Sequence, residues 1–265
     1  MDLGLSGKRA LVTGSTAGIG LAIATALARE GATVIVNGRT QARVDEALAQ
    51  VKQQAGGKAD VQGLAVDLGT AAGAKAVIAA HPELDVLVNN LGIYQAKPFE
   101  QLTDDDWTRI LEVNVLSGVR LARHYFPGML KRNAGRVVFI SSESGVQIPA
   151  EMIHYGVTKS AQVSLARGMA ELTAGTNVTV NSVLVGPTRS EGVEQFVAGL
   201  AKDKGLTPEQ VEREFFKTMR PTSLIKRFET PEEVAAVVTF LCGQAASAIN
   251  GAAVRAEGGL LKGML

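Results

Sequence analysis

Tyr155 and Lys159 stand four positions apart in a segment with helical periodicity, so both side chains should project from one face of that helix. An ammonium beside a phenol favours the phenolate and lowers the pKa of the tyrosine. Such a tyrosine can exchange a proton with an alcohol or carbonyl oxygen, and Ser142, at the end of a predicted strand, can hold that oxygen. The same spacing also fits an exposed aromatic and cation pair that only supports the helix.

A glycine-rich turn, Gly14-Ser15-Thr16-Ala17-Gly18-Ile19-Gly20, connects a predicted strand to a predicted helix. Small residues there let the backbone approach a diphosphate, whose charge is met by free N–H groups and the positive end of the helix dipole. The glycine spacing differs from the G-x-G-x-x-G fingerprint and from a Walker loop. Taken alone, the turn fits either a nucleotide site or a tight strand-to-helix connection.

The second predicted strand ends in Asn37-Gly38-Arg39-Thr40, without the carboxylate that commonly binds the adenosine ribose in NAD sites. The guanidinium of Arg39 can instead pair with a 2′-phosphate. This predicts NADP(H) as the preferred cofactor, with NAD(H) as a second choice. The alternative is a solvated surface arginine at the start of a helix.

Short β-branched runs alternate with longer helical segments, the pattern of a parallel sheet with crossover helices. Strands are predicted at residues 9–13, 33–36, 61–66, 86–89, 137–141, 178–184 and 253–256. Helices are predicted at residues 19–30, 41–54, 70–80, 103–132, 153–174 and 231–242. We therefore expect an α/β chain with one domain over residues 1–265, a Rossmann-type doubly wound parallel sheet of about seven strands.

Residues 189–229 do not follow this alternation of strands and helices. They place large apolar residues, including Leu206, Phe215 and Met219, among charged ones. This composition predicts a helical substrate lid that excludes water from a pocket. It fits equally well an amphipathic pair of helices packed on the sheet or on a neighbouring subunit.

The composition excludes several partners. Lys and Arg total 27 against 26 Asp and Glu, a formal net charge of +1, which argues against capture of nucleic acid or an anionic membrane. The long uncharged runs are interrupted by polar residues and glycines, so no membrane span is expected. One cysteine, Cys242, permits no intrachain disulfide and favours a cytoplasmic location. Three scattered histidines offer no framework for a metal site.

In order and spacing, the motifs together resemble the short-chain dehydrogenase/reductase family, and within it the 3-oxoacyl-acyl-carrier-protein reductases. The resemblance covers essentially the whole chain. The residues that carry it are the glycine turn after Thr13, Asp67-Leu68, Asn89-Asn90-Leu91-Gly92, Asn114, Ser142, Tyr155-x-x-x-Lys159, Val180-Asn181-Ser182-Val183, Gly186 and Glu257-Gly258-Gly259.

The resemblance implies a catalytic tetrad of Asn114, Ser142, Tyr155 and Lys159. In it, Tyr155 exchanges the substrate proton, Ser142 orients the reacting oxygen, Lys159 binds the nicotinamide ribose, and Asn114 holds a water that links Lys159 to solvent. It also implies these cofactor contacts: the turn from Gly14 to Gly20 for the diphosphate, Asp67 and Leu68 for the adenine, Asn90 and Gly92 for the ribose side, and Gly186, Thr188 and Ser190 for the nicotinamide, beside Tyr155 and Lys159.

The expected function is that of an NADP(H)-dependent ketoreductase, an oxidoreductase that moves a hydride between nicotinamide and a small-molecule carbonyl or secondary alcohol. The resemblance further implies a homotetramer. Two alternatives stay open: a nucleotide-binding regulator on the same fold, and a lyase, isomerase or epimerase without net redox turnover. Turnover of a ketone with NADPH would exclude the regulator, and net NADPH consumption separates the reductase from the others.

Overall fold

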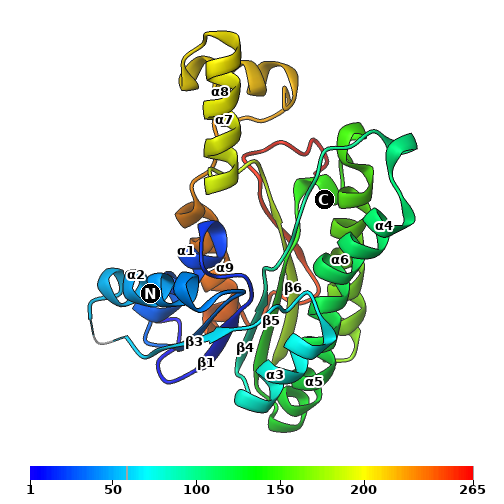
Figure 1. The fold of residues 1–265 in the computed structure, drawn as a ribbon. Helices are drawn as coiled ribbons and strands as arrows, with labels where there is room; N and C mark the ends of the chain where they lie inside the picture. The colour runs from blue at the N-terminus through cyan, green and yellow to red at the C-terminus, as the bar shows by residue number, and fades with distance from the viewer. Residues whose placement is uncertain (58, 265) are drawn as a thin grey trace.

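The computed structural model describes residues 1–57 and 59–264, leaving aside the side chains of residues 195, 196 and 204. Within these residues, seven parallel strands form one sheet in the order β3-β2-β1-β4-β5-β6-β7 (Figure 1). The strands are β1 (Arg9–Val12), β2 (Thr33–Gly38), β3 (Val61–Ala65), β4 (Val86–Asn89), β5 (Gly135–Ile140), β6 (Val178–Val185) and β7 (Ala253–Ala256). The doubly wound sheet predicted from the sequence is confirmed. The strand order reverses between β1 and β4, and ligands bind at such a switch point.

Helices cover both faces of the sheet (Figure 1). On one face lie α1 (Gly18–Arg29), α2 (Gln41–Gln54) and α9 (Pro231–Cys242); on the other lie α3 (Ala71–Ala80), α5 (Ser117–Arg132) and α6 (Ile153–Glu171). In the part of the chain described, no helix combines the length and the apolar character needed to cross a membrane.

The sheet has a hydrophobic core on each face, and successive residues of a strand pack into one core and then the other. Leu11 packs into the cluster that holds Leu121 of α5, whereas Val12 packs into the cluster that holds Ile23 of α1. All four side chains are fully buried. Because successive strand side chains point to opposite faces, a strand buried on both sides is a continuous apolar run, which is the signal that located these strands in the sequence.

The helix predicted over residues 103–132 is present as a continuous helical path from Asp104 to Arg132, but it is not a single α-helix. It is divided into α4 (Asp104–Leu111) and α5 by a π-turn, Glu112–Leu116. A π-turn adds one residue to the hydrogen-bonded ring without ending the helix, so the chain continues as a helix on both sides of it. Asn114 lies within this turn.

Helices α7 (Glu191–Lys204) and α8 (Pro208–Thr218) stand beyond the end of β6, in yellow in Figure 1. The ring of Phe215 lies 5.0 Å from both Phe216 and Phe228, measured between centroids. This aromatic cluster packs α8 against the chain that leads back to α9, so the helices predicted as a lid have a small apolar core of their own.

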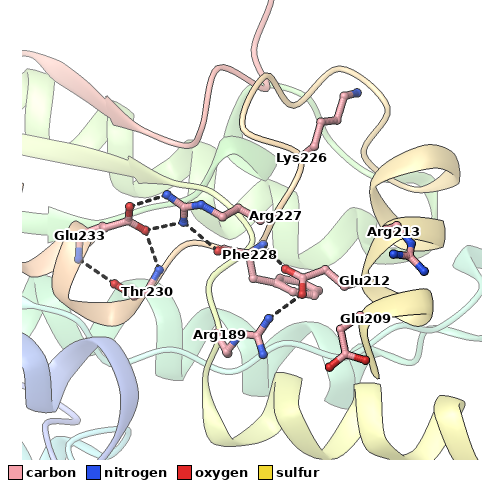
Figure 2. Close-up of a pocket in the computed structure, with 9 residues that line it drawn as sticks. All are labelled: Arg189, Glu209, Glu212, Arg213, Lys226, Arg227, Phe228, Thr230 and Glu233. Carbon is pink, nitrogen blue, oxygen red and sulfur yellow. Dashed lines mark hydrogen bonds and ion pairs between the residues drawn. The ribbon is translucent and has the colours of Figure 1, made fainter. Parts of the chain in front are cut away.

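Ion pairs fasten the base of α8 (Figure 2). Glu212 accepts from Arg189 at 2.6 Å and from the backbone N–H of Phe228 at 2.8 Å. Arg227 pairs with Glu233 of α9 at 2.7 Å. These groups line a cavity of about 600 Å³. Glu212 thus holds α8 to the segment after β6 and to Phe228, whereas the pair of Arg227 with Glu233 joins the segment before α9 to the start of that helix.

Candidate active site

A cavity of about 570 Å³ at the carboxyl ends of the strands brings catalytic and cofactor candidates together. The predicted residues that line it are Ile19, Asn90, Gly92, Ser142, Tyr155, Lys159, Gly186, Thr188 and Ser190. Phe215, Met219 and Phe228 line it from α8 and the segment that follows. Within the described residues, the other candidates lie outside this lining: Gly14, Ser15, Thr16, Gly18, Gly20, Arg39, Asp67, Leu68 and Asn114.

Tyr155 and Lys159 lie on one face of α6, with Nζ of Lys159 5.5 Å from the centroid of the Tyr155 ring. Burial lowers the pKa of Lys159 to about 7. Burial also raises the pKa of Tyr155 above its ordinary value, and a hydrogen bond with Ser142 opposes that rise. The expectation that the pKa of Tyr155 is lowered is therefore wrong for this structure, because desolvation of the phenol outweighs the hydrogen bond with Ser142 and the charge of Arg220, which lower that pKa. Tyr155 is a protonated acid at neutral pH.

Ser142 follows β5 and begins the short 3₁₀ turn Glu143–Gly145. Its hydroxyl oxygen accepts from the backbone N–H of Ser144 at 3.1 Å. The hydroxyl itself donates to Oε2 of Glu143, also at 3.1 Å. Glu143 is buried, with 3% of its surface exposed. The serine therefore has a carboxylate as its immediate neighbour.

Asn114 is buried in the π-turn and is linked to Lys159 through Gln162. Its side chain accepts from the backbone N–H of Ile93 at 2.7 Å and donates to Thr158 at 3.0 Å. Its backbone carbonyl accepts from Nε2 of Gln162 at 2.6 Å, while Oε1 of Gln162 accepts from Nζ of Lys159 at 3.1 Å. A side-chain amide thus bridges the two residues that the resemblance links through a water.

The glycine turn has the backbone geometry of a diphosphate cradle. Gly14 and Gly18 adopt positive φ angles of 62° and 54°, which glycine reaches without strain. A side chain at Gly20 would collide with the carbonyl oxygen of Gly14. In the described structure, no side chain caps the N-terminus of α1 at Ala17, so the first N–H groups stay free for an anion. These residues fit a dinucleotide.

Side-chain hydrogen bonds hold this turn in place. Asn37 accepts from the backbone N–H of Gly14 at 3.2 Å and donates to the carbonyls of Leu64 in β3 and of Val66 just after it. Ser15 is fully buried, and its hydroxyl donates to Val12 and accepts from Asn37. Nδ2 of Asn90 donates to the carbonyl of Gly14 at 3.0 Å. The side chains of Ser15 and Asn90 thus shape the cradle.

At the adenosine end, Arg39 is exposed just after β2. Asp67 is exposed after β3, and its Oδ1 accepts from the backbone N–H of Gly69 at 2.9 Å. The side chain of Leu68 is buried in the core, so a contact from Leu68 to an adenine would come from its backbone.

The loop after β6 carries the nicotinamide candidates. Thr188 is buried and donates to the carbonyl of Gly186 at 3.0 Å. Ser190 accepts from the backbone N–H of Val193 and caps α7. Backbone bonds between Pro187, Arg189 and Glu229 pair this loop with the segment before α9. Position 190 therefore joins the candidate cofactor site directly to α7.

Sequence reasoning missed the residues that support the site, namely Asn37, Glu143, Gln162 and Arg220. Gln162 could have been found, because it lies three residues after Lys159 and shares its helix face. Glu143 and Arg220, whose side chains form an ion pair at 3.0 Å, are far apart in the chain and had no local signal. Among the described residues, no group of three or more His, Cys, Asp or Glu side chains could hold a metal ion.

Comparison with known proteins identifies the family. The family model described as short chain dehydrogenase matches residues 8–200. An uncharacterized oxidoreductase of Bacillus subtilis, YvaG, is 49% identical over 262 residues, 99% of both chains. The D-beta-hydroxybutyrate dehydrogenase of Cupriavidus necator is 35% identical, over 96% of this chain and 98% of that relative. The crystal structure of L-sorbose reductase from Gluconobacter frateurii, complexed with NADPH and L-sorbose, has a TM-score of 0.92 at 33% identity and covers 100% of both chains.

The chain therefore belongs to the short-chain dehydrogenase/reductase family. It is an NAD(P)-dependent oxidoreductase.

Proposed function

We propose that the protein catalyses the NADP(H)-dependent interconversion of a small-molecule carbonyl and a secondary alcohol, with Tyr155 as the general acid and base. The observation that carries this proposal is the meeting of Ser142, Tyr155 and Lys159 in one cavity with Ile19 from the cradle and Gly186 from the loop after β6.

The chain's own residues move the proton and hold the reacting oxygen. Tyr155, protonated at neutral pH, donates its proton to the carbonyl oxygen during reduction and takes it back during oxidation. Ser142 donates a hydrogen bond to the same oxygen and stabilises its developing charge. Lys159, whose Nζ donates to the carbonyl of Ile140 at 2.8 Å, binds the ribose hydroxyls next to Tyr155. A bound nicotinamide supplies or accepts the hydride.

The proposed preference for NADP(H) over NAD(H) rests on Arg39. Its guanidinium stands exposed at the end of β2, where a 2′-phosphate gains a charge-assisted partner. The L-sorbose reductase that shares this fold was solved with NADPH, which supports the same preference here.

We further propose that α7 and α8 act as the lid, that the assembly is a homotetramer, and that the protein works in the cytoplasm. Phe215 and Met219 support the lid, because they line the cavity wall. Exposed apolar side chains at Leu116 of the π-turn and Val157 of α6 support subunit contacts through these helices. Light scattering of the purified protein tests the assembly: a mass of four chains is expected, and a monomer would contradict it.

The test of function is a panel of carbonyls and alcohols followed by NADPH absorbance and repeated with NADH. The panel includes a ketose, a 3-hydroxy acid, a 3-oxoacyl thioester and an apolar ketone. We expect net NADPH oxidation with at least one carbonyl. Coenzyme binding without turnover across the panel would favour the regulator, and product formation without net NADPH consumption would favour a lyase or epimerase.

A further inference from the structure

A buried ion pair joins the catalytic serine to the segment after α8. Oε1 of Glu143 accepts from Nε of Arg220 at 3.0 Å, and 3% and 9% of the two residues' surfaces are exposed. Nη1 of Arg220 lies 3.5 Å from Glu151 and also donates to the carbonyl of Met219. The guanidinium lies 5.9 Å from the ring of Phe215. Arg220 is therefore fixed to α8 at one end and to Glu143 at the other.

The second oxygen of Glu143 competes for the proton that Ser142 needs. The backbone N–H of Ser144 already occupies the serine oxygen, so the hydroxyl proton can point to Oε2 of Glu143 or into the cavity. A buried carboxylate without a counterion accepts a strong, charge-assisted bond. With Arg220 sharing its charge, Glu143 is a weaker acceptor, and the Ser142 hydroxyl can turn toward a substrate oxygen.

The same pair acts on Tyr155 through space. The charge of Glu143 raises the pKa of Tyr155, and the charge of Arg220 lowers it. The other titratable groups lining this cavity are Tyr94, Glu151, Tyr155 and Lys159. Loss of the Arg220 charge would therefore turn the Ser142 hydroxyl toward Glu143 and raise the pKa of Tyr155.

The geometry points to Arg220 as a positioning residue: by pairing with Glu143, it releases the Ser142 hydroxyl for the substrate and makes the catalytic centre depend on the seating of α8. This inference rests on the proposed function for the role of Ser142. It assigns to the α8 segment an electrostatic task beyond covering the pocket.

Kinetics of Arg220→Gln, Glu143→Gln and the double variant test the inference. Arg220→Gln should lose about 100-fold in kcat, comparable to removing one oxyanion donor, with little change in KM. Glu143→Gln should stay within about fivefold of the wild type, and the double variant should exceed Arg220→Gln by about tenfold or more, because the competing charge is gone.

Arg227→Gln is the matched control, since it breaks an exposed ion pair on the same segment (Figure 2) and should leave kcat unchanged. Arg220→Lys, which keeps the charge, should retain more activity than Arg220→Gln and serves if the glutamine variant folds poorly. A double variant as slow as Arg220→Gln would reduce Arg220 to a structural residue and overturn the inference.

A second measurement does not depend on turnover. NMR titration of isotope-labelled tyrosine, assigned with Tyr155→Phe, should show a lower Tyr155 pKa in Glu143→Gln than in the wild type and a higher one in Arg220→Gln. If the wild type turned over nothing in the panel, the proposed function would fail while this titration still decided whether the pair controls the site. Identical titrations in all three proteins would contradict the inference.

Discussion

Nζ of Lys159 donates to Oε1 of Gln162 at 3.1 Å, one helical turn further along α6. The other end of the Gln162 amide donates to the backbone carbonyl of Asn114 at 2.6 Å. A water in this position could accept and pass on a proton, whereas an amide holds its hydrogens. Gln162 therefore orients the buried lysine without relaying a proton from it.

Replacement of Gln162 by leucine should remove the acceptor that favours the charged form of Lys159. The pKa of that lysine, about 7 in this structure, should fall further. We expect kcat at neutral pH to drop by about tenfold and the unfolding free energy by about 1–3 kcal/mol, because the carbonyl of Asn114 is left unpaired. A pH profile of kcat and urea unfolding measure the two effects.

Gln162→Glu should change the pKa of Lys159 in the opposite direction, because a carboxylate beside the lysine raises that pKa. Gln50→Leu, an exposed glutamine on α2, controls for the loss of an amide. Equal pH profiles for the leucine and glutamate variants would show that position 162 does not control the lysine.

Tyr155→Phe removes the proton that the proposed mechanism transfers. Turnover should fall by about 10²–10⁴-fold, while affinity for NADPH, measured by fluorescence titration, should stay close to that of the wild type. A variant that kept a tenth of wild-type turnover would rule out Tyr155 as the acid.

Arg39→Ala tests the coenzyme preference. A charge-assisted pair is worth about 1.5–3 kcal/mol, or about 10 to 150-fold in kcat/KM for NADPH over NADH. The glycine turn contributes no second cation, because it reads Ser15-Thr16-Ala17, so the lower half of this range is expected. The substitution should raise KM for NADPH and leave NADH kinetics unchanged.

Arg43→Ala is the matched control for Arg39, because Arg43 is already paired with Glu191 of α7 at 3.0 Å. If both substitutions raised KM for NADPH equally, the preference would come from the general positive field at the start of α2. A wild type that used both coenzymes equally well would return Arg39 to the role of a surface arginine.

Glu229 should make stability depend on pH. It is buried beneath the loop after β6, and its Oε2 has no hydrogen-bond partner among the described residues. Burial, and then the charge of Glu233, raises its pKa from 4.5 to about 7. Folding therefore favours the protonated form. Its stabilising contribution is complete below the unfolded pKa of 4.5 and is lost as the pH rises through about 7.

Urea unfolding between about pH 4.5 and pH 7 measures this effect. The unfolding free energy of the wild type should fall across this window relative to that of Glu229→Gln, which cannot ionise. Glu194→Gln, an exposed position on α7, should follow the wild type. Parallel curves for the wild type and Glu229→Gln would show that Glu229 ionises at its ordinary pKa.

The fold was predictable because its signals are local. The strand Val86–Asn89 is buried at every position and apolar over its first three residues, and strands buried on both faces need nothing more to be recognised. The same holds for Tyr155 and Lys159, whose shared helix face follows from a spacing of four residues. The glycine turn also belongs to this class, since its conformations depend on adjacent residues.

What the sequence determined by itself was therefore the order of strands and helices, the glycine cradle and the pairing of Tyr155 with Lys159. Only the tertiary structure decided the charge state around them, because desolvation depends on what the rest of the chain packs against each group. It also decided the contact of Glu143 with Arg220, which joins residues 77 positions apart. No periodicity along the chain records such a contact, since its partners meet only when the segment after α8 returns to the carboxyl end of β5.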